Sequence, residues 1–348
     1  MTAAAHGIAV HAADGIAVHG LTKRYPDGTE AVRGISFAVP SGQIVGLVGP
    51  NGAGKSSALN MLATLTSPTE GDAHVYGVSV RDRAAVRPLL GVALQATGLD
   101  PMMSVADHFA VHAALHGMRA RPARVRAGEL QVVFRLTAVR RRRVGELSGG
   151  TQRRVALALA LLHEPRAIVF DEPTVALDPN LRRAVWDLLA DLRGRGLAVL
   201  FSTHYMDEAE HLCQRVELMS KGRIVASGTP DELKATVAAG RLRIRVRHGA
   251  EHAVRALELA ATRGLLPAGA APVVADGVVE IPTGPHDTRV DALLALLAEF
   301  DVAVADLHWG HGTLDDVFTR LAEATEQEPA SSVPVEHRAL ARRGGGRT

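Results

Sequence analysis

The chain has 348 residues, a formal net charge of +2 and a single cysteine, Cys213. This length predicts about two domains, each large enough to bury a hydrophobic core. One cysteine excludes an intrachain disulfide, the small net charge excludes a strongly basic or acidic chain, and no apolar run approaches the ~20 residues that a membrane-spanning helix needs.

The N-terminal segment predicts an extension, residues 1–13, followed by strands. The pentapeptide GIAVH occurs at 7–11 and again at 15–19, and only the second copy continues into alternating residues broken by Asp-Gly and Ser-Gly turns. Such alternation is typical of β-strands. Because the first residues carry no positive segment, we expect no signal peptide. From Gln43 an apolar strand, a glycine-rich loop and a helix at about 54–65 follow.

The middle of the chain predicts an α/β domain that spans residues 14–235. Strands that are apolar throughout, such as those in RAIVFDEP and LAVLFSTH, alternate with helices. This pattern is typical of a mostly parallel sheet that is covered on both faces. A largely helical insertion at about 96–150 interrupts it, and the strands before it predict an antiparallel β subdomain.

The sequence changes character after about residue 240. RLRIRV, VVADGVVEI and FDVAVADLHWG predict strands, and helices are expected near 250–263 and 288–299. We expect a small C-terminal α+β domain at 240–324. The tail 325–348 has little apolar surface to bury and is expected to be disordered.

The segment GPNGAGKSS fits the phosphate-binding pattern G-x-x-x-x-G-K-[ST] of a P-loop, between a strand and a helix. Its glycines let backbone N–H groups turn toward phosphates, and the helix dipole favours their negative charge. Lys55 should reach the β- and γ-phosphates, and the Ser56 hydroxyl should ligate Mg²⁺. The alternative is a glycine-rich turn that binds nothing. The loop consists of Gly49, Pro50, Asn51, Gly52, Ala53, Gly54, Lys55, Ser56 and Ser57.

Two adjacent carboxylates, Asp171 and Glu172, end the buried strand of AIVFDEPT. Ligands bind at this edge of an open parallel sheet. Asp171 can hold the hydrated Mg²⁺, and Glu172 can orient and polarise the attacking water. The alternative is that both carboxylates only cap the following turn.

A second anion site is indicated at the start of another helix. Ser148, Gly149 and Gly150 lie just before an apolar helical run, so free backbone N–H groups are expected there. One nucleotide needs only one phosphate loop, and the P-loop already supplies it.

Residues 16–235 resemble the ATPase subunits of ABC transporters. The resemblance depends on five motifs in order: GPNGAGKSS, Gln95, LSGGTQRR, VFDEP with ALDP, and His204. It implies that two chains pack head to tail around two ATP molecules, with each site formed by the P-loop of one chain and the LSGG signature loop of the other. Ser148 and Gly150 would then donate to the γ-phosphate held by the other copy, which gives the second anion site its purpose.

The resemblance implies roles for four more residues. Tyr25 matches the aromatic residue that stacks on adenine, with a buried strand-end tyrosine as the alternative. Gln95 matches the glutamine that senses metal and water and begins the helical insertion, which would touch the membrane partner. His204 matches the histidine that contacts the γ-phosphate. Asp178 matches the loop aspartate that communicates across the dimer.

The chain departs from the family pattern at two places. Thr151 stands where glutamine usually follows LSGG, and Val175-Ala176 stands where Ser or Gly is common. Thr151 leaves Ser148 and the glycines intact, whereas the second change puts cross-dimer communication in doubt.

Two ligand-like or charged stretches have a structural interpretation: a solvated or partly buried helix face for the first, and a surface feature for the second. His108, His112 and His116 share one helix face, a spacing that can bind zinc, but nothing in the sequence nearby completes a tetrahedral set. The basic run at 139–144 could suggest nucleic acid. Next to the signature loop, it is expected to face solvent, lipid head groups or acidic partner loops, and we expect no nucleic acid.

The C-terminal part resembles the daunorubicin-resistance type of ATPase subunit through ASGTPDELKA and a domain that ends in GTLDDVFTRLAEAT. The resemblance implies an ATP- and Mg²⁺-dependent exporter subunit that homodimerises and powers a separate permease at the cytoplasmic face of the membrane, for drug-like or lipid cargo. The alternatives are a soluble ABC ATPase that acts on ribosomes or DNA, and an importer subunit.

Overall fold

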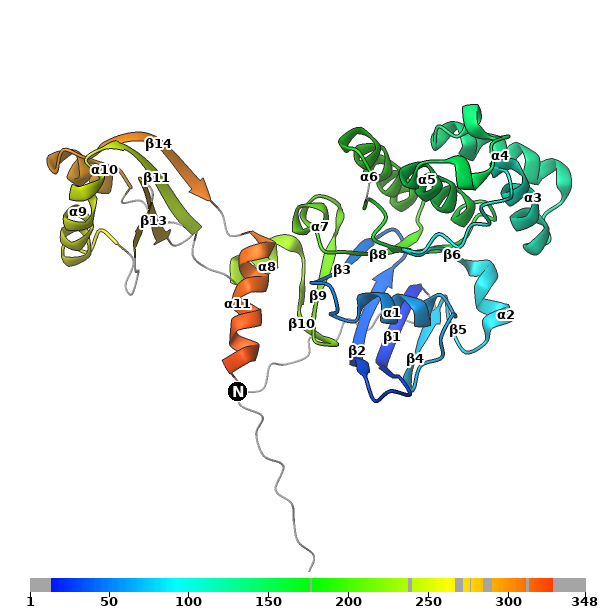
Figure 1. Cartoon of the computed structure of the whole chain (residues 1–348). Coiled ribbons are helices and arrows are strands. Elements are labelled where there is room, and N and C mark those ends of the chain that lie inside the picture. The colour runs from blue at the N-terminus through cyan, green and yellow to red at the C-terminus, as the bar shows by residue number, and fades with distance from the viewer. Residues whose placement is uncertain are drawn as a thin grey trace, which may run out of the picture.

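The computed structural model describes residues 14–175, 177–236, 240–266, 272–275, 277–283, 290–310 and 313–327. The expected extension 1–13, the residues of the expected tail from 328 onward and Ala176 lie outside these ranges. Figure 1 shows a larger part at the N-terminal side and a smaller C-terminal sheet with its own helices. Among the described residues, no helix is long and apolar enough to cross a membrane.

A six-stranded sheet forms the centre of the larger part, in the order β10-β9-β3-β8-β7-β6. Every neighbouring pair is parallel except β10 with β9. Its strands are β3 (Ile44–Val48), β6 (Leu90–Ala93), β7 (Ala167–Asp171), β8 (Ala198–Thr203), β9 (Arg215–Ser220) and β10 (Arg223–Gly228).

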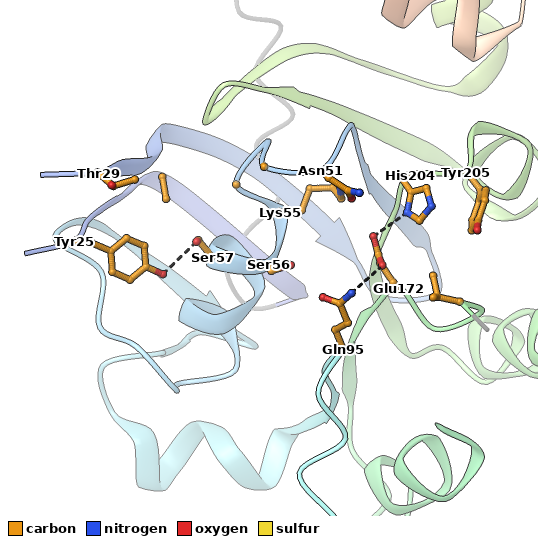
Figure 2. Close-up of a pocket in the computed structure, with 14 residues that line it drawn as sticks. Tyr25, Thr29, Asn51, Lys55, Ser56, Ser57, Gln95, Glu172, His204 and Tyr205 are labelled. Atoms are coloured by element: carbon orange, nitrogen blue, oxygen red, sulfur yellow. Dashed lines mark hydrogen bonds and ion pairs between the residues drawn. The ribbon is translucent and has the colours of Figure 1, made fainter. Parts of the chain in front are cut away.

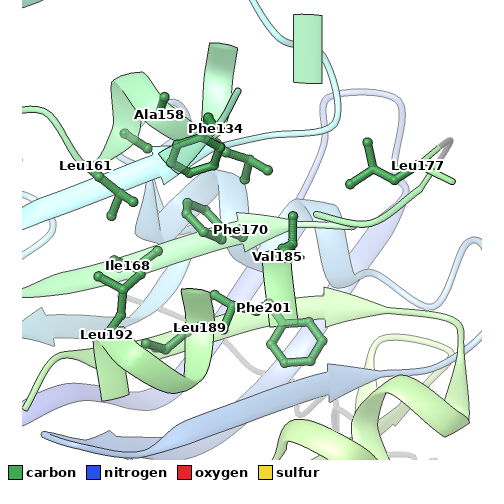
Figure 3. Packing of buried hydrophobic residues seen from close by; sticks show 14 of the residues in the cluster. Phe134, Ala158, Leu161, Ile168, Phe170, Leu177, Val185, Leu189, Leu192 and Phe201 are labelled. Carbon is green, nitrogen blue, oxygen red and sulfur yellow. The ribbon is translucent and has the colours of Figure 1, made fainter. Parts of the chain in front are cut away.

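Strands β3, β7 and β8 at the centre of this sheet are buried on both faces, which explains why they are mostly apolar. Ile168 and Phe170 of β7 pack into one core, whereas Ala167 and Val169 pack into the other. The first core lies under the helical insertion and the helices that follow it, where Phe134, Leu161 and Leu189 surround β7 (Figure 3). These helices are α3 (Val105–Leu115), α4 (Ala120–Val133), α5 (Gly149–Ala160), α6 (Pro179–Gly194) and α7 (Met206–Leu212).

The second core lies between the six-stranded sheet and an antiparallel sheet in the order β2-β1-β4-β5. Helix α1 (Lys55–Leu62) contributes Leu59 and Met61 to this core. The strands are β1 (Gly15–Arg24), β2 (Glu30–Pro40), β4 (Glu70–Val75) and β5 (Val78–Ser79), and α2 (Arg83–Val86) follows them.

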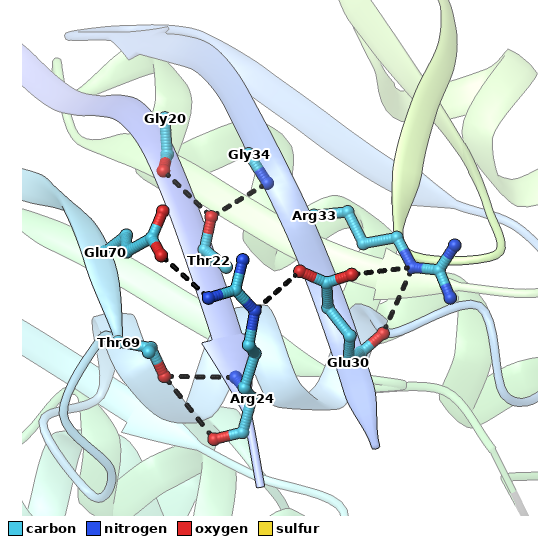
Figure 4. Close-up of polar contacts among 8 residues, drawn as sticks. All are labelled: Gly20, Thr22, Arg24, Glu30, Arg33, Gly34, Thr69 and Glu70. Atoms are coloured by element: carbon cyan, nitrogen blue, oxygen red, sulfur yellow. Dashed lines mark hydrogen bonds and ion pairs between the residues drawn. The ribbon is translucent and has the colours of Figure 1, made fainter. Parts of the chain in front are cut away.

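The end of β1 is held on both sides by its neighbouring strands (Figure 4). The Arg24 guanidinium donates to Glu30 of β2 at 2.9 Å and to Glu70 of β4 at 2.8 Å. The Arg24 amide donates to the Thr69 hydroxyl at 3.0 Å. Exposed ion pairs of this kind contribute little stability, but together they fix the direction in which the chain leaves β1 toward Tyr25.

The smaller part is an antiparallel sheet in the order β12-β13-β11-β14, covered by two helices. Leu242 and Ile244 of β11 pack with Leu257 and Leu297 of those helices in a separate core. The elements are β11 (Gly240–His248), α9 (Ala250–Thr262), β12 (Val273–Ala275), β13 (Val278–Thr283), α10 (Val290–Glu299) and β14 (Ala303–Gly310).

The last helix, α11 (Leu314–Gln327), packs on the larger part beside α7 and α8 (Pro230–Thr236) (Figure 1). Leu314 and Val317 are fully buried in the core that contains β7. The Leu314 amide donates to Glu210 Oε1 of α7 at 2.8 Å. The region expected as an accessory domain at 240–324 therefore ends in a helix that packs against the ATPase-like part, and that helix continues to Gln327.

Candidate functional site

A cleft of about 760 Å³ opens at the carboxyl ends of the central strands (Figure 2). It brings together many of the residues that the sequence singled out, although they are spread over about 180 positions of the chain. These are Tyr25, Asn51, Gly52, Gly54, Lys55, Ser56, Ser57, Gln95, Glu172 and His204. The cleft is also lined by Thr29, Ala31, Val175 and Tyr205.

The P-loop needs glycine where the chain passes close to its neighbours. Gly54 caps α1 with φ 102°, and a Cβ there would lie 2.2 Å from the Ala31 carbonyl oxygen. A Cβ on Gly49 would lie 2.1 Å from the Met219 carbonyl oxygen. Gly49, Pro50 and Ala53 do not line the cleft, whereas Gly54 and the first residues of α1 do. The N–H groups that a helix leaves unpaired at its start therefore belong to residues at the cleft.

Lys55 is the first residue of α1 and is 5% exposed. Its Nζ donates to the carbonyls of Gly49 at 2.6 Å and Pro50 at 2.9 Å. Burial lowers the pKa of Lys55, and the nearby Glu172 and Asp171 raise it in opposition. The result is a cation held by the loop, at the mouth of which a phosphate can bind.

Glu172 lies at the centre of the polar contacts in the cleft (Figure 2). Its Oε1 is 2.8 Å from His204 Nδ1, and its Oε2 accepts from Gln95 Nε2 at 3.4 Å. These residues follow β7, β8 and β6, whose carboxyl ends share one edge of the sheet. Glu172 also has φ 50°, a left-handed conformation that is uncommon for a non-glycine residue and often found at functional sites.

Asp171 is buried beside Glu172, with 3% exposure, and accepts a hydrogen bond from the Ser202 hydroxyl. Ser56 and Gln95 line the cleft with side-chain oxygens. No cluster of three acidic, histidine or cysteine side chains within the described ranges could hold a metal alone. Mg²⁺ needs no such cluster, because it is usually held by one or two protein oxygens, water and substrate phosphates. Ser56 and Gln95 line the cleft and offer oxygens of the kind that Mg²⁺ prefers. Asp171 precedes the cleft-lining Glu172 but does not itself line the cleft.

Tyr25 follows the end of β1 and lines the cleft. In Figure 2 it lies on the opposite side of the cleft from Glu172, with the start of α1 between them. It is half-buried, and its hydroxyl forms a 3.2 Å hydrogen bond with Ser57. The Lys23 Nζ lies 5.3 Å from the ring centroid. An accessible ring at this place can stack on a flat group that enters the cleft.

The signature loop is not part of this cleft. Ser148 is the N-cap of α5 and accepts from the Thr151 amide at 3.4 Å. Ser148 and Gly149 are exposed, Gly150 follows them in the first turn of α5, and a Cβ added to Gly149 would meet nothing within 4 Å. The packing of this chain alone therefore does not require a glycine at position 149.

Asp178 also lies outside the residues that line the cleft. Its carboxylate caps α6 by accepting from the amides of Asn180 and Leu181, both at 3.0 Å. The preceding segment is anchored by the Thr174 hydroxyl, which donates to the buried Glu208 of α7 at 2.8 Å. This contact joins the loop after Glu172 to the helix after His204.

Several residues at the site were not predicted from the sequence. Thr29 and Ala31 line the cleft because of backbone positions that the sequence does not reveal, and Val175, one of the two departures from the family pattern, also lines it. The Tyr205 ring packs against His204 with centroids 4.1 Å apart and ring planes tilted by 38°, and its adjacency to that histidine could have indicated it. Ser202 lies two residues before His204 on β8, whose carboxyl end meets that of β7.

The fold and the cleft define a P-loop ATPase cassette with a helical insertion. The chain belongs to the ABC transporter ATP-binding family: the profile described as "ABC transporter" matches residues 32–175, and the full-length relatives below extend the match. The expected fold class, a P-loop core with an antiparallel β subdomain, a helical insertion and a C-terminal α+β part, is confirmed. The chain is accordingly an ABC-type ATPase, which converts ATP and water to ADP and phosphate.

Among curated proteins, the daunorubicin resistance ATP-binding protein DrrA3 of Streptomyces coeruleorubidus is 36% identical over 88% of this chain and 95% of its own length. The daunorubicin/doxorubicin resistance ATP-binding protein DrrA of Streptomyces peucetius is 33% identical over 94% and 98%. The Nod factor export ATP-binding protein I of Burkholderia orbicola is 42% identical over 61% and 69%. The expected resemblance to the drug-resistance type is confirmed.

Solved structures show the same fold. The ATP-binding subunit of an ABC transporter is 26% identical and covers 64% of this chain and 92% of its own, with a TM-score of 0.60. The protein cbiO1 of Clostridium perfringens, part of the ABC transporter complex cbiONQ, is 26% identical with a TM-score of 0.57 over 64% and 91%. A dimeric ATP-binding cassette in a post-hydrolysis state, bound to ADP and Pi, is 27% identical with a TM-score of 0.58 over 62% and 98%.

Proposed function

We propose that this chain is the ATP-hydrolysing subunit of an exporter, in which two copies close on two ATP molecules and drive a separate permease at the cytoplasmic face of the membrane. The observation that carries the proposal is the position of the signature loop. Lys55, Gln95, Glu172 and His204 surround one cleft, whereas Ser148 and Gly149 lie exposed outside it. One chain thus carries two separate sets of candidate phosphate ligands, the P-loop and the signature loop. When a second copy is added, the P-loop of one chain and the signature loop of the other can bind the same ATP.

The free space around Gly149 supports this dimer. The glycine has room for a Cβ within its own chain, so packing within one chain does not explain it. In the proposed dimer, a residue without a side chain would let the partner's phosphates approach the backbone closely. The N-terminus of α5 would present its free N–H groups and the Ser148 hydroxyl to the phosphates held by the partner's P-loop. The dimeric cassette bound to ADP and Pi, which is 27% identical, is consistent with such an assembly.

Within one site, the roles follow from the contacts. The cation of Lys55 and the N–H groups of the P-loop bind the phosphates, and the Tyr25 ring stacks on the adenine. Glu172 accepts a proton from the attacking water, while Gln95 and His204 hold its two carboxylate oxygens. Mg²⁺, held by Ser56 and Asp171 with Gln95 nearby, would neutralise charge on the phosphates. Asp178 lies on the loop between the two sites in this arrangement.

The relatives support the direction of transport and the need for a membrane partner. The names of the similar proteins refer to daunorubicin and doxorubicin resistance and to Nod factor export, and cbiO1 is part of a larger transporter complex. We therefore propose efflux of a drug-like or lipid molecule through a separate integral-membrane subunit.

The dimer can be tested with Glu172→Gln. We expect hydrolysis to slow by ~10²–10⁴-fold, because the general base is lost, while ATP binding is preserved and light scattering shows a dimer in ATP and a monomer without it. Glu129→Gln, which changes an exposed carboxylate of α4, should behave as the unmodified chain. A Glu172→Gln protein that stays monomeric at saturating ATP would overturn the dimer, and unchanged turnover would overturn the role of Glu172.

The shared sites can be tested by mixing variants. Lys55→Ala and Ser148→Arg each damage both sites of a homodimer. A mixture forms heterodimers in which one site combines an intact P-loop with an intact signature loop, so part of the activity should return. If the mixture is as inactive as its components, the two loops do not act across the dimer.

A further inference from the structure

Arg153 is a charged residue buried inside α5. Its side chain is 6% exposed, and arginine is seldom buried to this extent unless it is paired. Its Nη1 donates to the Leu94 carbonyl oxygen, and its Nη2 donates to the Asp171 carbonyl oxygen. Arg153 does not line the cleft, so these contacts are not part of nucleotide binding.

The two carbonyls belong to the residues directly before Gln95 and Glu172. Leu94 follows β6 and Asp171 ends β7, so one guanidinium joins two segments that are adjacent in the sheet. The side chains that follow them meet at 3.4 Å in the cleft (Figure 2). Because the guanidinium is a rigid planar fork, it fixes the separation of the two backbones that carry these side chains.

The peptide unit between Asp171 and Glu172 is held from both ends. Its carbonyl accepts from Arg153, and its N–H donates to the backbone oxygen and the hydroxyl of Ser202, both at 3.1 Å. Glu172 has φ 50° in this arrangement. A left-handed conformation at a non-glycine residue persists only when the surrounding contacts enforce it, and Arg153 supplies one of those contacts.

Two opposing effects act on the buried charge of Arg153. Burial lowers the pKa of its guanidinium, and the nearby Asp171 and Glu172 carboxylates raise it. The two carboxylates therefore offset part of the cost of burying this cation.

We propose that Arg153 is a positioning residue, which holds Gln95 and Glu172 at the separation that hydrolysis requires. This inference depends on the proposed role of Glu172 as the general base. Without the guanidinium, two carbonyls lose their donor and the Glu172 backbone can relax. The carboxylate then moves relative to the attacking water, while the P-loop that binds ATP is unchanged.

The neighbouring Arg154 provides a matched control. It lies on the same helix and donates to the backbone carbonyls of Phe134 at 3.1 Å and Arg135 at 3.3 Å, and to the Thr151 hydroxyl at 2.8 Å. It thus anchors the helical insertion with the same chemistry but contacts neither Leu94 nor Asp171.

The test compares Arg153→Met, Arg153→Lys and Arg154→Met, with kcat from phosphate release and ATP affinity from a fluorescent ATP analogue. For Arg153→Met we expect kcat to fall by about 10- to 100-fold, because small displacements of a catalytic group have effects of this size, with affinity close to that of the unmodified chain. Arg153→Lys can reach only one of the two carbonyls and should give an intermediate kcat. Arg154→Met keeps both carbonyl contacts of Arg153 and reaches Ser148 only through Thr151, so it should lose much less kcat than Arg153→Met, even where it lowers the melting temperature.

The outcomes are separable from those of the proposed function. An unchanged kcat in Arg153→Met, an equal loss in Arg154→Met, or a loss of ATP affinity in place of kcat would overturn the positioning role. If Arg153→Met does not fold, the comparison of Arg153→Lys with Arg154→Lys decides by the same criteria. Normal hydrolysis by Glu172→Gln, run alongside, would instead refute the proposed general base.

Discussion

Two opposing effects act on the buried charge of Lys55 at the site: burial disfavours the charged form, and neighbouring carboxylates favour it. Burial lowers the pKa of Lys55, while the Glu172 and Asp171 carboxylates raise it. Two loop carbonyls accept hydrogen bonds from its ammonium. The lysine is therefore oriented before a phosphate arrives, which reduces the entropy that binding must overcome.

Lys55→Ala should abolish hydrolysis and weaken ATP binding. A hydrogen bond to a charged group contributes about 1.5–3 kcal/mol, so we expect the ATP dissociation constant to rise roughly ten- to a hundredfold. Binding of a fluorescent ATP analogue and phosphate release measure the two effects. Lys234→Ala removes an ammonium of α8 that lies outside the cleft and should change neither. Undiminished turnover in Lys55→Ala would refute the P-loop assignment.

Residues whose chemistry is carried by a local motif were predictable, and those that act through distant backbone were not. Lys55 and Glu172 are identified by their immediate neighbours in sequence, and both line the cleft. Arg153 contacts carbonyls 59 and 18 positions away. Every residue has a carbonyl, so no sequence pattern indicates which one a side chain will reach. Thr29 and Ala31 were not predicted either, because no local motif marks the residues that the folded backbone brings to the cleft.

Helices and strands were predictable where burial imposes a regular pattern of apolar residues on the sequence. Strands β3, β7 and β8 are buried on both faces and are therefore mostly apolar. The helix expected at 54–65 is observed as α1 at Lys55–Leu62. Contacts between elements were not predictable. His116 at the C-cap of α3 stacks on His163 after α5, with ring centroids 3.7 Å apart. Nothing in the sequence pairs these two histidines, which join the helical insertion to the core.

The His116–His163 contact predicts a pH-dependent stability. Burial first, and then His116, lower the pKa of His163 to about 4, whereas histidine in an unfolded chain titrates near 6.5. Between these values the unfolded chain binds more protons, so stability is full above about pH 6.5 and falls as the pH drops toward 4. Urea midpoints at pH 7 and pH 5 measure this loss. His163→Phe keeps an aromatic ring against His116 and should reduce the difference, and an identical pH dependence in that variant would contradict the assignment.

At the scale of the whole molecule, residues that follow one another in the C-terminal region belong to two different cores. The chain leaves the ATPase part after α8, forms a separate sheet with its own core, and returns in α11 to the first core. The sequence shows that α11 is amphipathic, with Leu314, Val317, Phe318 and Leu321 at helical spacing. It does not show which core accepts that face, because an apolar stripe fits either one. The expected domain at 240–324 therefore could not separate α11 from the sheet that precedes it.

The position of α11 can be tested by comparing two leucines of similar burial. Leu314 is 0% exposed in the ATPase core, and Leu257 is 2% exposed in the C-terminal core. Either change to alanine should cost about 2–5 kcal/mol, but in different parts of the molecule. Hydrogen exchange with mass spectrometry should show faster exchange in α7 and α8 for Leu314→Ala, and in β11 and β13 for Leu257→Ala. Faster exchange in β11 and β13 for Leu314→Ala, with α7 unaffected, would mean that α11 is stabilised by the C-terminal sheet. The expected pattern would show that α11 is stabilised by the ATPase core beside α7, and α7 begins two residues after His204.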